Sequence, residues 1–114
     1  MIFHFGKKAL NDAIRTGKNQ IFLSVSVAES EAINACVARL AKREGFVFKE
    51  ENPIALPNGA TLSFLLASNR VTAGHCGNVY VINCFNEANF TDISGIAHSW
   101  ALHKKYRVVF YSEE

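Results

Sequence analysis

Cysteine and histidine side chains lie close together in one polar stretch of the sequence. His75 and Cys76 are adjacent, and Cys84 follows in the next segment. Adjacent ligands with that spacing match none of the common zinc patterns. A cysteine nucleophile could pair with His75, His98 or His103, but the sequence supplies no third group to orient the histidine. We therefore predict neither a catalytic residue nor a metal or cofactor site.

A basic cluster, "HKKYR", occupies residues 103–107 between a predicted helix and a predicted strand. Positive charge at the end of a helix is favourable by a few tenths to about 1 kcal/mol, so a capping role is enough to explain it. The alternative is weak contact with the phosphates of a nucleotide or nucleic acid. The candidate contacts are Arg70, His103, Lys104, Lys105 and Arg107, with Lys7, Lys8 and Lys18 adding positive charge.

Acidic residues are missing where catalysis would need them. The stretch "GNVYVINCFNE" (77–87) reads as a strand that ends in Ile82 and Asn83, where an α/β nucleotide hydrolase places its acids. Isoleucine cannot coordinate Mg²⁺, and an asparagine amide cannot take a proton from water at neutral pH. This strand end therefore predicts a protein without hydrolytic activity.

Length and composition predict one small soluble domain over residues 1–114. Apolar residues make up 49% and charged residues 19% of the 114 residues, and the net charge is +2, far from that of a dedicated nucleic-acid binder. The three cysteines form no CxxC pair, and neither a signal peptide nor a membrane-length apolar run is evident. These features favour the cytoplasm and no membrane contact.

The first half of the chain predicts a helix, a strand and a second helix. Residues 6–17 form a helical face that Gly17 ends, and residues 20–27 read as a strand buried on both faces, as in a parallel sheet. Ser26 and Glu29 form a capping box for the next helix, which ends at Gly45. The two apolar faces comprise Ala9, Leu10, Ala13 and Ile14, and then Ala32, Ile33, Cys36, Val37, Leu40 and Ala41.

The second half alternates strands with one more helix. We predict strands at 46–49, 78–83 and 106–112 and a hairpin joining 53–56 to 60–67. A polar loop spans 69–77. The helix at about 89–104 carries Ile93, Ile96, Ala97, Trp100 and Ala101 at helical spacing, more typical of core than of a binding site. This alternation predicts a three-layer α/β fold with a mostly parallel sheet.

Four separated blocks carry a family resemblance: "NQIFLS", "NPIALPNGATLSFL", "GNVYV" and "ALHKKYRVVFYS". In this order they resemble the ATPase domain of the large terminase subunit of tailed bacteriophages, the motor that packages DNA. The resemblance covers nearly the whole chain, from Phe3 to Ser112. It implies a RecA-like, P-loop hydrolase-like core in a phage- or prophage-encoded protein of the bacterial cytoplasm.

The same resemblance implies that the ATPase motifs are incomplete. The family's Walker A loop precedes the first helix, where Met1 stands here, so we expect a core that lacks the Walker A strand and loop. The family's Walker B acids fall on Ile82 and Asn83. Between these motifs, Arg70 and Gly77 are retained, whereas Ala73 replaces the family's glutamine. We expect an inactive ATPase.

Three functions remain open from the sequence. The first is a non-catalytic interaction module that mimics or regulates a component of phage DNA packaging. The second is residual binding of nucleotide or nucleic acid without hydrolysis, and the third is a folded prophage remnant with no selected task.

The strand "YRVVFYS" is the expected interaction surface. The resemblance implies that the phosphate-loop strand would lie beside it, so without that strand it becomes a bare edge that another chain can extend. We expect a homodimer with antiparallel strands, or a strand from a phage packaging protein. Proline at Val109 should abolish the dimer, provided that its N–H points outward. The interface residues are Tyr106, Val108, Val109, Phe110 and Tyr111.

The cysteines are expected to differ in reactivity. Cys36 should be buried on the inner face of its helix and inert, whereas Cys76, in the polar loop, should react readily with thiol reagents.

Overall fold

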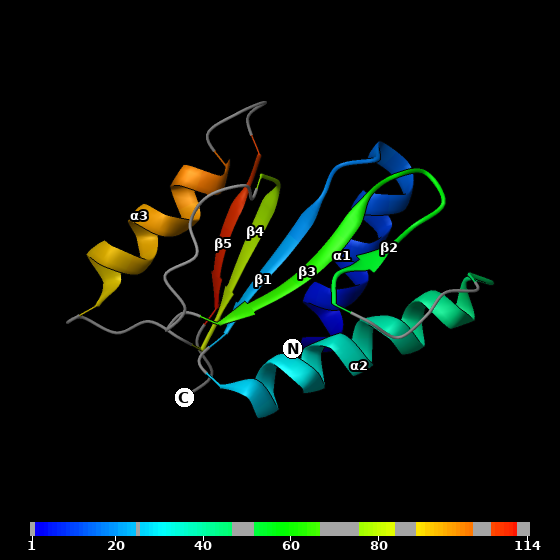
Figure 1. The fold of residues 1–114 in the computed structure, drawn as a ribbon, viewed down its shortest axis with the longest axis horizontal. Coiled ribbons are helices and arrows are strands. Elements are labelled where there is room, and N and C mark those ends of the chain that lie inside the picture. The colour runs from blue at the N-terminus through cyan, green and yellow to red at the C-terminus, as the bar shows by residue number, and fades with distance from the viewer. Residues whose placement is uncertain are drawn as a thin grey trace.

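A five-stranded sheet with helices on both faces forms the protein (Figure 1). The computed structural model describes residues 2–24, 26–46, 52–66, 76–83, 89–101 and 106–111. Along the chain the elements are α1 (Ile2–Thr16), β1 (Gln20–Ser24), α2 (Val27–Arg43), β2 (Ile54–Ala55), β3 (Thr61–Leu66), β4 (Asn78–Ile82), α3 (Phe90–Ala101) and β5 (Val108–Tyr111).

The strand order in the sheet is β2-β3-β1-β4-β5. β1 pairs in parallel with β3 and with β4, and β4 pairs in parallel with β5. Only the short β2 runs antiparallel, as the hairpin partner of β3. The predicted α/β class with a mostly parallel sheet is therefore confirmed.

Two apolar layers hold the helices against the sheet. On one face, α1 and α2 cover Phe22, Tyr80 and Ile82; on the other, α3 covers Val79 and Val81. The residues of β1 and β4 are buried throughout, as expected for central parallel strands. Aromatic rings on the first face stack from strand to strand, with centroid distances of 5.5 Å between Phe22 and Phe64 and 5.0 Å between Phe22 and Tyr80.

The predicted helix ends are largely confirmed. Gly17 has a φ of 72°, a conformation that costs glycine little, and its N–H donates to the Ala13 carbonyl. Ser26 caps α2, because its hydroxyl accepts from the N–H of Glu29. That cap also explains one correction: the strand predicted to reach residue 27 ends at Ser24, since Ser26 already belongs to the helix start. α1 begins earlier than predicted, at Ile2.

The buried face of α2 differs from the prediction at three positions. Ala32 is exposed, Cys36 is only half-buried, and Ala38 is buried instead. Ile33, Val37, Leu40 and Ala41 are buried as expected. The small alanine side chains contribute little to the sequence periodicity, so they did not fix the angle at which the helix packs.

The hairpin around Pro57 is confirmed, although β2 is shorter than predicted. The Leu56 N–H donates to the Ala60 carbonyl at 2.9 Å. Before β4, Gly77 passes close to the chain of Asn19, where an added Cβ would lie 2.4 Å from the carbonyl oxygen. The strand predicted at 46–49 and most of the loop predicted at 69–77 lie outside the described residues.

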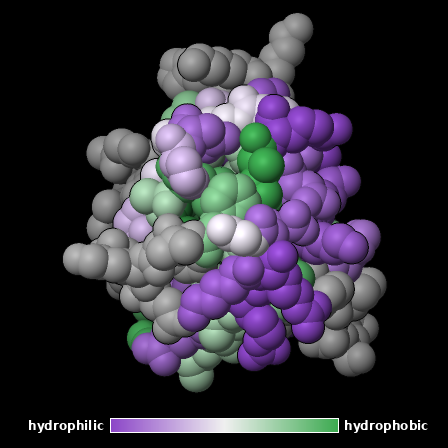
Figure 2. All heavy atoms as spheres, turned by 90° about the vertical axis from the view of Figure 1, so that its right-hand side faces the viewer, coloured by the Kyte–Doolittle hydropathy of each residue, from purple (hydrophilic) through white to green (hydrophobic). Residues whose placement is uncertain are grey.

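The side of the molecule that carries β2 and the C-terminal end of α2 is mostly hydrophilic, with one small hydrophobic area near its centre (Figure 2). Across the described residues, the exposed large hydrophobic side chains are Val27 and Phe90. No helix in the described part is long and apolar enough to cross a bilayer. The described surface on this side offers no broad apolar patch for a partner.

Candidate functional site

The carboxyl end of β4 carries the two residues that stand where the resemblance places catalytic acids. Ile82 is 1% exposed and packs in the core on the α1 side of the sheet. Asn83, the next residue, has a φ of 52°, in the left-handed region that asparagine tolerates better than most residues. The strand therefore ends in a buried apolar side chain followed by a turn residue.

Asn83 is held in place by two hydrogen bonds. Its backbone N–H donates to the Tyr111 carbonyl at 2.8 Å, and its side-chain amide donates to Glu29 Oε1 at 3.2 Å. The Glu29 carboxylate, in the first turn of α2, is thus bound to an amide at this strand end. Within the described residues, no group of three or more His, Cys, Asp or Glu side chains is placed to hold a metal ion.

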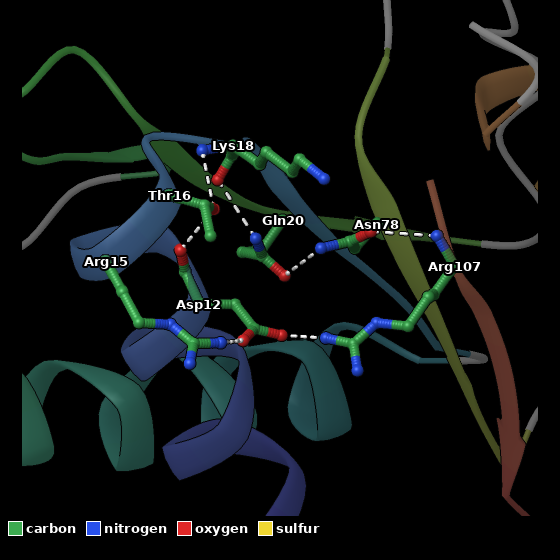
Figure 3. Close-up of polar contacts among 7 residues, drawn as sticks. All are labelled: Asp12, Arg15, Thr16, Lys18, Gln20, Asn78 and Arg107. Carbon is green, nitrogen blue, oxygen red and sulfur yellow. Dashed lines mark hydrogen bonds and ion pairs between the residues drawn. The ribbon is translucent and has the colours of Figure 1, made fainter. Parts of the chain in front are cut away.

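A polar network ties the opposite, amino end of β4 to its neighbours (Figure 3). Asn78, which is 4% exposed, donates to Gln20 Oε1 at 3.3 Å and accepts from the Arg107 N–H at 2.8 Å. The Gln20 amide in turn donates to the Lys18 carbonyl at 2.9 Å. Because these groups are buried, each needs its partner, and the network fixes the chain where it enters β5.

Asp12 of α1 binds two arginines in the same region (Figure 3). Its carboxylate accepts from Arg15 at 3.1 Å and from the guanidinium of Arg107. The Asp12 side chain is 11% exposed, whereas those of Arg15 and Arg107 are 77% and 46% exposed. Arg107 is therefore anchored twice, through its backbone to β4 and through its side chain to α1.

The outer surface of this region is a basic depression of about 760 Å³. Its lining residues are His4, Lys7, Lys8, Asn11, Asp12, Ile14, Arg15 and Arg107. Of the five predicted phosphate contacts, Arg107 lies here, together with the supporting Lys7 and Lys8. Arg70, His103, Lys104 and Lys105 lie outside the described residues. Lys18 does not line the depression; its ammonium group lies 5.8 Å from the centroid of the Tyr106 ring. No sequence pattern pointed to Asp12, because Arg107, one of its two partners, is distant along the chain.

β5 lies at the end of the described sheet, with β4 as its one strand neighbour. Its four residues, Val108 to Tyr111, are all half-buried, in contrast to the fully buried β4. Val108 and Phe110 face α3, whereas Val109 and Tyr111 face the α1 side. The predicted edge position of this strand is confirmed within the described sheet.

The hydrogen bonds to β4 show which backbone groups of β5 point outward. The carbonyls of Arg107 and Tyr111 accept from the N–H groups of Val79 and Asn83, each at 2.8 Å. Backbone groups along a strand alternate between its two sides, so Val109, midway between these residues, also faces β4. Val108 and Phe110 consequently direct their N–H and C=O groups away from β4.

This orientation corrects the choice of Val109 for the proline test. The N–H of Val109 faces the interior of the sheet, so proline there would break the ladder between β4 and β5 rather than the open edge. The outward N–H groups belong to Val108 and Phe110.

The two described cysteines do not show the predicted contrast in burial, whereas their contrast in reactivity stays a prediction. Cys36 is half-buried against the core rather than fully buried, and Cys76 is half-buried as well. Burial raises the pKa of the Tyr106 hydroxyl, and the neighbouring Cys76 side chain raises it further. His98 bonds to Ser94 within α3, at 2.8 Å from its carbonyl. Cys84, His75 and His103 lie outside the described residues.

No protein-family model matches the chain. Two curated proteins do: the probable terminase ATPase subunit of Haemophilus phage HP1, with 34% identity over 110 residues, and the terminase ATPase subunit of Escherichia phage P2, with 32% identity over 111 residues. Each match covers 96% of this chain, which spans only 18% and 19% of the relatives' lengths.

A solved structure has the same fold. The crystal structure of the HK97 bacteriophage large terminase matches with a TM-score of 0.71 over 95% of this chain and 26% of that protein, at 10% sequence identity. The sheet and helices described above therefore correspond to part of a terminase large subunit. This chain is accordingly a relative of the ATPase subunits of phage terminases, similar to one segment of them over nearly its whole length.

Proposed function

We propose that the protein is a non-catalytic terminase relative that acts by binding other proteins, as a mimic or regulator of phage DNA packaging in the bacterial cytoplasm. The observation that carries the first part is the end of β4. A metal-dependent hydrolase needs a carboxylate there to hold Mg²⁺ and another to activate water. Here Ile82 is buried in the core, and the Asn83 amide is bonded to Glu29.

Glu29 is a poor substitute for the absent acids. Its carboxylate lies in the first turn of α2 and accepts the Asn83 amide. A single carboxylate in that position supplies one of the two functions that phosphoryl transfer needs.

The test of this part is an ATPase assay with and without Mg²⁺, run beside a phage terminase ATPase subunit as the positive control. We expect no turnover above buffer. Magnesium-dependent hydrolysis that survives a second purification and is lost in Asn83→Ala or Glu29→Gln would contradict the proposal. Hydrolysis unchanged in both variants would indicate a contaminating enzyme.

The second part of the proposal concerns where a protein partner binds. We infer that the sheet is part of a RecA-like core in which β5 stands beside the position of the phosphate-loop strand. The position of β5 at the end of the described sheet and the outward N–H and C=O groups of Val108 support binding by strand addition at this edge. The occupant is either a second copy of this chain or a strand of a packaging protein.

A second candidate function is weak binding of nucleic acid. The basic depression beside Arg107 supports it, because cationic side chains outnumber the carboxylate of Asp12 there. The modest net charge of +2 argues against strong binding. Titration of duplex DNA at two salt concentrations distinguishes the candidates: a saturable signal that weakens with salt and is reduced by Lys7→Ala/Lys8→Ala would favour nucleic-acid binding.

A further inference from the structure

We propose that the basic depression on α1 binds a short acidic segment of a partner protein, through the carboxylates of its Asp and Glu side chains. The inference rests on the proposed function, because it states the chemistry of a protein partner and gives that partner a surface other than the backbone of β5. It assigns to a protein the depression that the second candidate function gives to nucleic acid.

The net positive charge of the described residues is concentrated in this depression. Four cationic side chains and one carboxylate line it, which gives a formal charge of +3 with His4 neutral. The described residues outside it contain four further Lys or Arg and four Asp or Glu, so their charges balance. A ligand that fits the depression therefore meets the whole net charge, whereas a longer polyanion also covers surface that does not attract it. The lining cations are Lys7, Lys8, Arg15 and Arg107, and the carboxylate is that of Asp12.

The buried carboxylate of Asp12 holds two guanidinium groups of the depression in place (Figure 3). Its Oδ1 accepts from Arg15 at 3.1 Å and its Oδ2 accepts from Arg107, so side chains from α1 and from the chain before β5 converge on one group. A guanidinium carries five donors in a fork that matches a carboxylate, so each can bind a further carboxylate while it keeps this contact. Because both side chains are already ordered, binding there has a lower entropic cost.

α1 extends the cationic surface beyond the two arginines. His4, Lys8 and Asn11 lie at helical spacing with Arg15, on the face opposite the buried Ala13. From His4 to Arg15 this line is about 16 Å long at about 1.5 Å per residue, which equals about five residues of extended chain. The depression therefore suits a short segment with several carboxylates rather than a single anion.

The stability of α1 does not account for its two lysines. The helix contains one acidic residue, Asp12, which two arginines already share. Lys7 and Lys8 lie in the N-terminal half of the helix, where the helix dipole does not stabilise cations. Both side chains are exposed and line the depression, so they are placed to contact a ligand.

Two features favour protein carboxylates over the phosphates of a nucleic acid. The lining includes the amide of Asn11 and the half-buried side chain of Ile14, which can bond to the backbone and contact the apolar side chains of a peptide. A nucleic acid carries charge along its whole length, and the balanced charges outside the depression add little to its binding. A short acidic segment needs no more than the depression itself.

The first test measures the binding of fluorescein-labelled peptides by anisotropy in low salt. One peptide of about 12 residues alternates glutamate with glycine, and the other has glutamine in place of glutamate. We expect saturable binding of the glutamate peptide with a Kd of about 10–100 μM and no detectable binding of the glutamine peptide. Equal binding of the two peptides, or no binding of either, would overturn the inference.

Charge-removing variants locate the bound peptide. Lys7→Gln/Lys8→Gln should weaken binding about tenfold, because two cations of the depression are lost. The matched control, Arg39→Gln/Arg43→Gln, removes the same charge from exposed positions of α2 and should weaken binding less than about twofold. An equal effect of the two variants would mean that the peptide responds to overall charge, which contradicts binding in the depression.

Arg107→Lys tests the arranged guanidinium groups without a change of charge. Lysine cannot present the planar fork, so the variant should bind the glutamate peptide about fivefold more weakly. The matched exchange Lys7→Arg also keeps the charge and should not weaken binding. An unchanged Kd for Arg107→Lys would contradict the role given to the arginine pair.

Two further probes test the other occupants. A single-stranded DNA oligonucleotide with as many negative charges as the glutamate peptide should bind no more tightly than the peptide. Tighter binding of the oligonucleotide, lost in Lys7→Gln/Lys8→Gln, would overturn the inference in favour of nucleic acid. Inorganic phosphate that displaces the peptide at an equal concentration would likewise overturn it, since it would indicate a site for a single anion.

The outcomes separate this inference from the proposed function. Absence of peptide binding overturns the inference, whatever the ATPase assay shows. ATP hydrolysis by the wild type contradicts the proposed function without affecting the peptide titration.

Discussion

β4 and β5 are neighbours in one parallel sheet, yet their surroundings differ. All five residues of β4 are buried, with β1 on one side and β5 on the other. The four residues of β5 are half-buried, with only β4 beside them in the described sheet. β4 therefore pairs with a strand on each side, whereas β5 pairs with one strand in the described sheet. We therefore predict that substitutions in β4 lower stability more than matched substitutions in β5.

The largest predicted effect compares Ile82 with Tyr111, which are register partners on the two strands. Ile82→Asp places a carboxylate in the core, where ionisation or an unpaired polar group is costly, and should lower the free energy of unfolding by about 4 kcal/mol. Tyr111→Asp, at a half-buried position, should lower the free energy of unfolding by about half as much or less. Urea unfolding followed by circular dichroism measures both, at a concentration low enough to avoid association. Equal losses would show that the two strands are buried alike.

The next effect concerns the polar link between the strands. Asn78→Ala should lower the free energy of unfolding by about 2–3 kcal/mol, because it leaves Gln20 Oε1 and the Arg107 N–H without their partner. Asn83→Ala, at the other end of β4, should cost about 1 kcal/mol, since its side-chain partner Glu29 is only half-buried. Urea unfolding of the two variants gives the comparison. A smaller loss for Asn78→Ala than for Asn83→Ala would contradict the importance assigned to the amino-end network.

A gain in stability is predicted inside β4. The Tyr80 hydroxyl is buried without a hydrogen-bond partner among the described residues, so Tyr80→Phe should raise the free energy of unfolding by about 1 kcal/mol at neutral pH. Thermal unfolding of the variant and the wild type tests this. A loss of stability in the variant would indicate that the hydroxyl makes a stabilising contact.

The same hydroxyl makes stability depend on alkaline pH. Burial raises the pKa of Tyr80 from 10.0 to about 12. The folded state holds this proton more tightly than the unfolded state. The resulting contribution to the free energy of unfolding is therefore complete below pH 10 and declines as the pH rises toward 12. The loss should reach about 2–3 kcal/mol and be absent in Tyr80→Phe. Parallel pH slopes for the two proteins would contradict the assignment.

The smallest effect concerns the two arginines that share Asp12. Arg107→Ala removes a half-exposed guanidinium from the buried Asp12 carboxylate just before β5. It should lower the free energy of unfolding by about 1 kcal/mol. Arg15→Ala removes a mostly exposed guanidinium and should lower the free energy of unfolding by about 0.3 kcal/mol. Unfolding in low salt measures the difference. The reverse order would mean that the Asp12–Arg107 ion pair contributes less to stability than the exposed Asp12–Arg15 pair.

Sequence patterns predicted most of the architecture because the patterns are local. The apolar runs of β1 and β4, the Ser26 cap and the Gly17 stop each depend on neighbouring residues. The ends of elements were less accurate: α1 starts before residue 6, and β1 ends at Ser24. The buried face of α2 was predicted at the wrong angle, because alanine side chains are compatible with both the buried and the exposed side of a helix.

The candidate site depended more on contacts between distant residues. That Ile82 and Asn83, rather than acidic residues, stand at the end of β4 is visible in the sequence. The last strand was predicted too long, because β5 begins at Val108 rather than at residue 106. The direction of the Val109 N–H is not visible in the sequence, because it follows from the pairing of β5 with β4 rather than from the residues of β5. The role of Asp12 likewise requires knowing that α1 packs beside Arg107, far along the chain.

Amide hydrogen exchange of β5, followed residue by residue by NMR at several protein concentrations, tests the central claim most directly. The amides of Val109 and Tyr111 face β4 and should be protected at every concentration. That of Val108 faces away from β4 and should become protected only when another strand pairs with this edge; if the partner is a second copy, its protection should rise with concentration. Rapid exchange of Val108 at concentrations up to about 500 μM, while Val109 and Tyr111 remain protected, would contradict self-pairing through this edge.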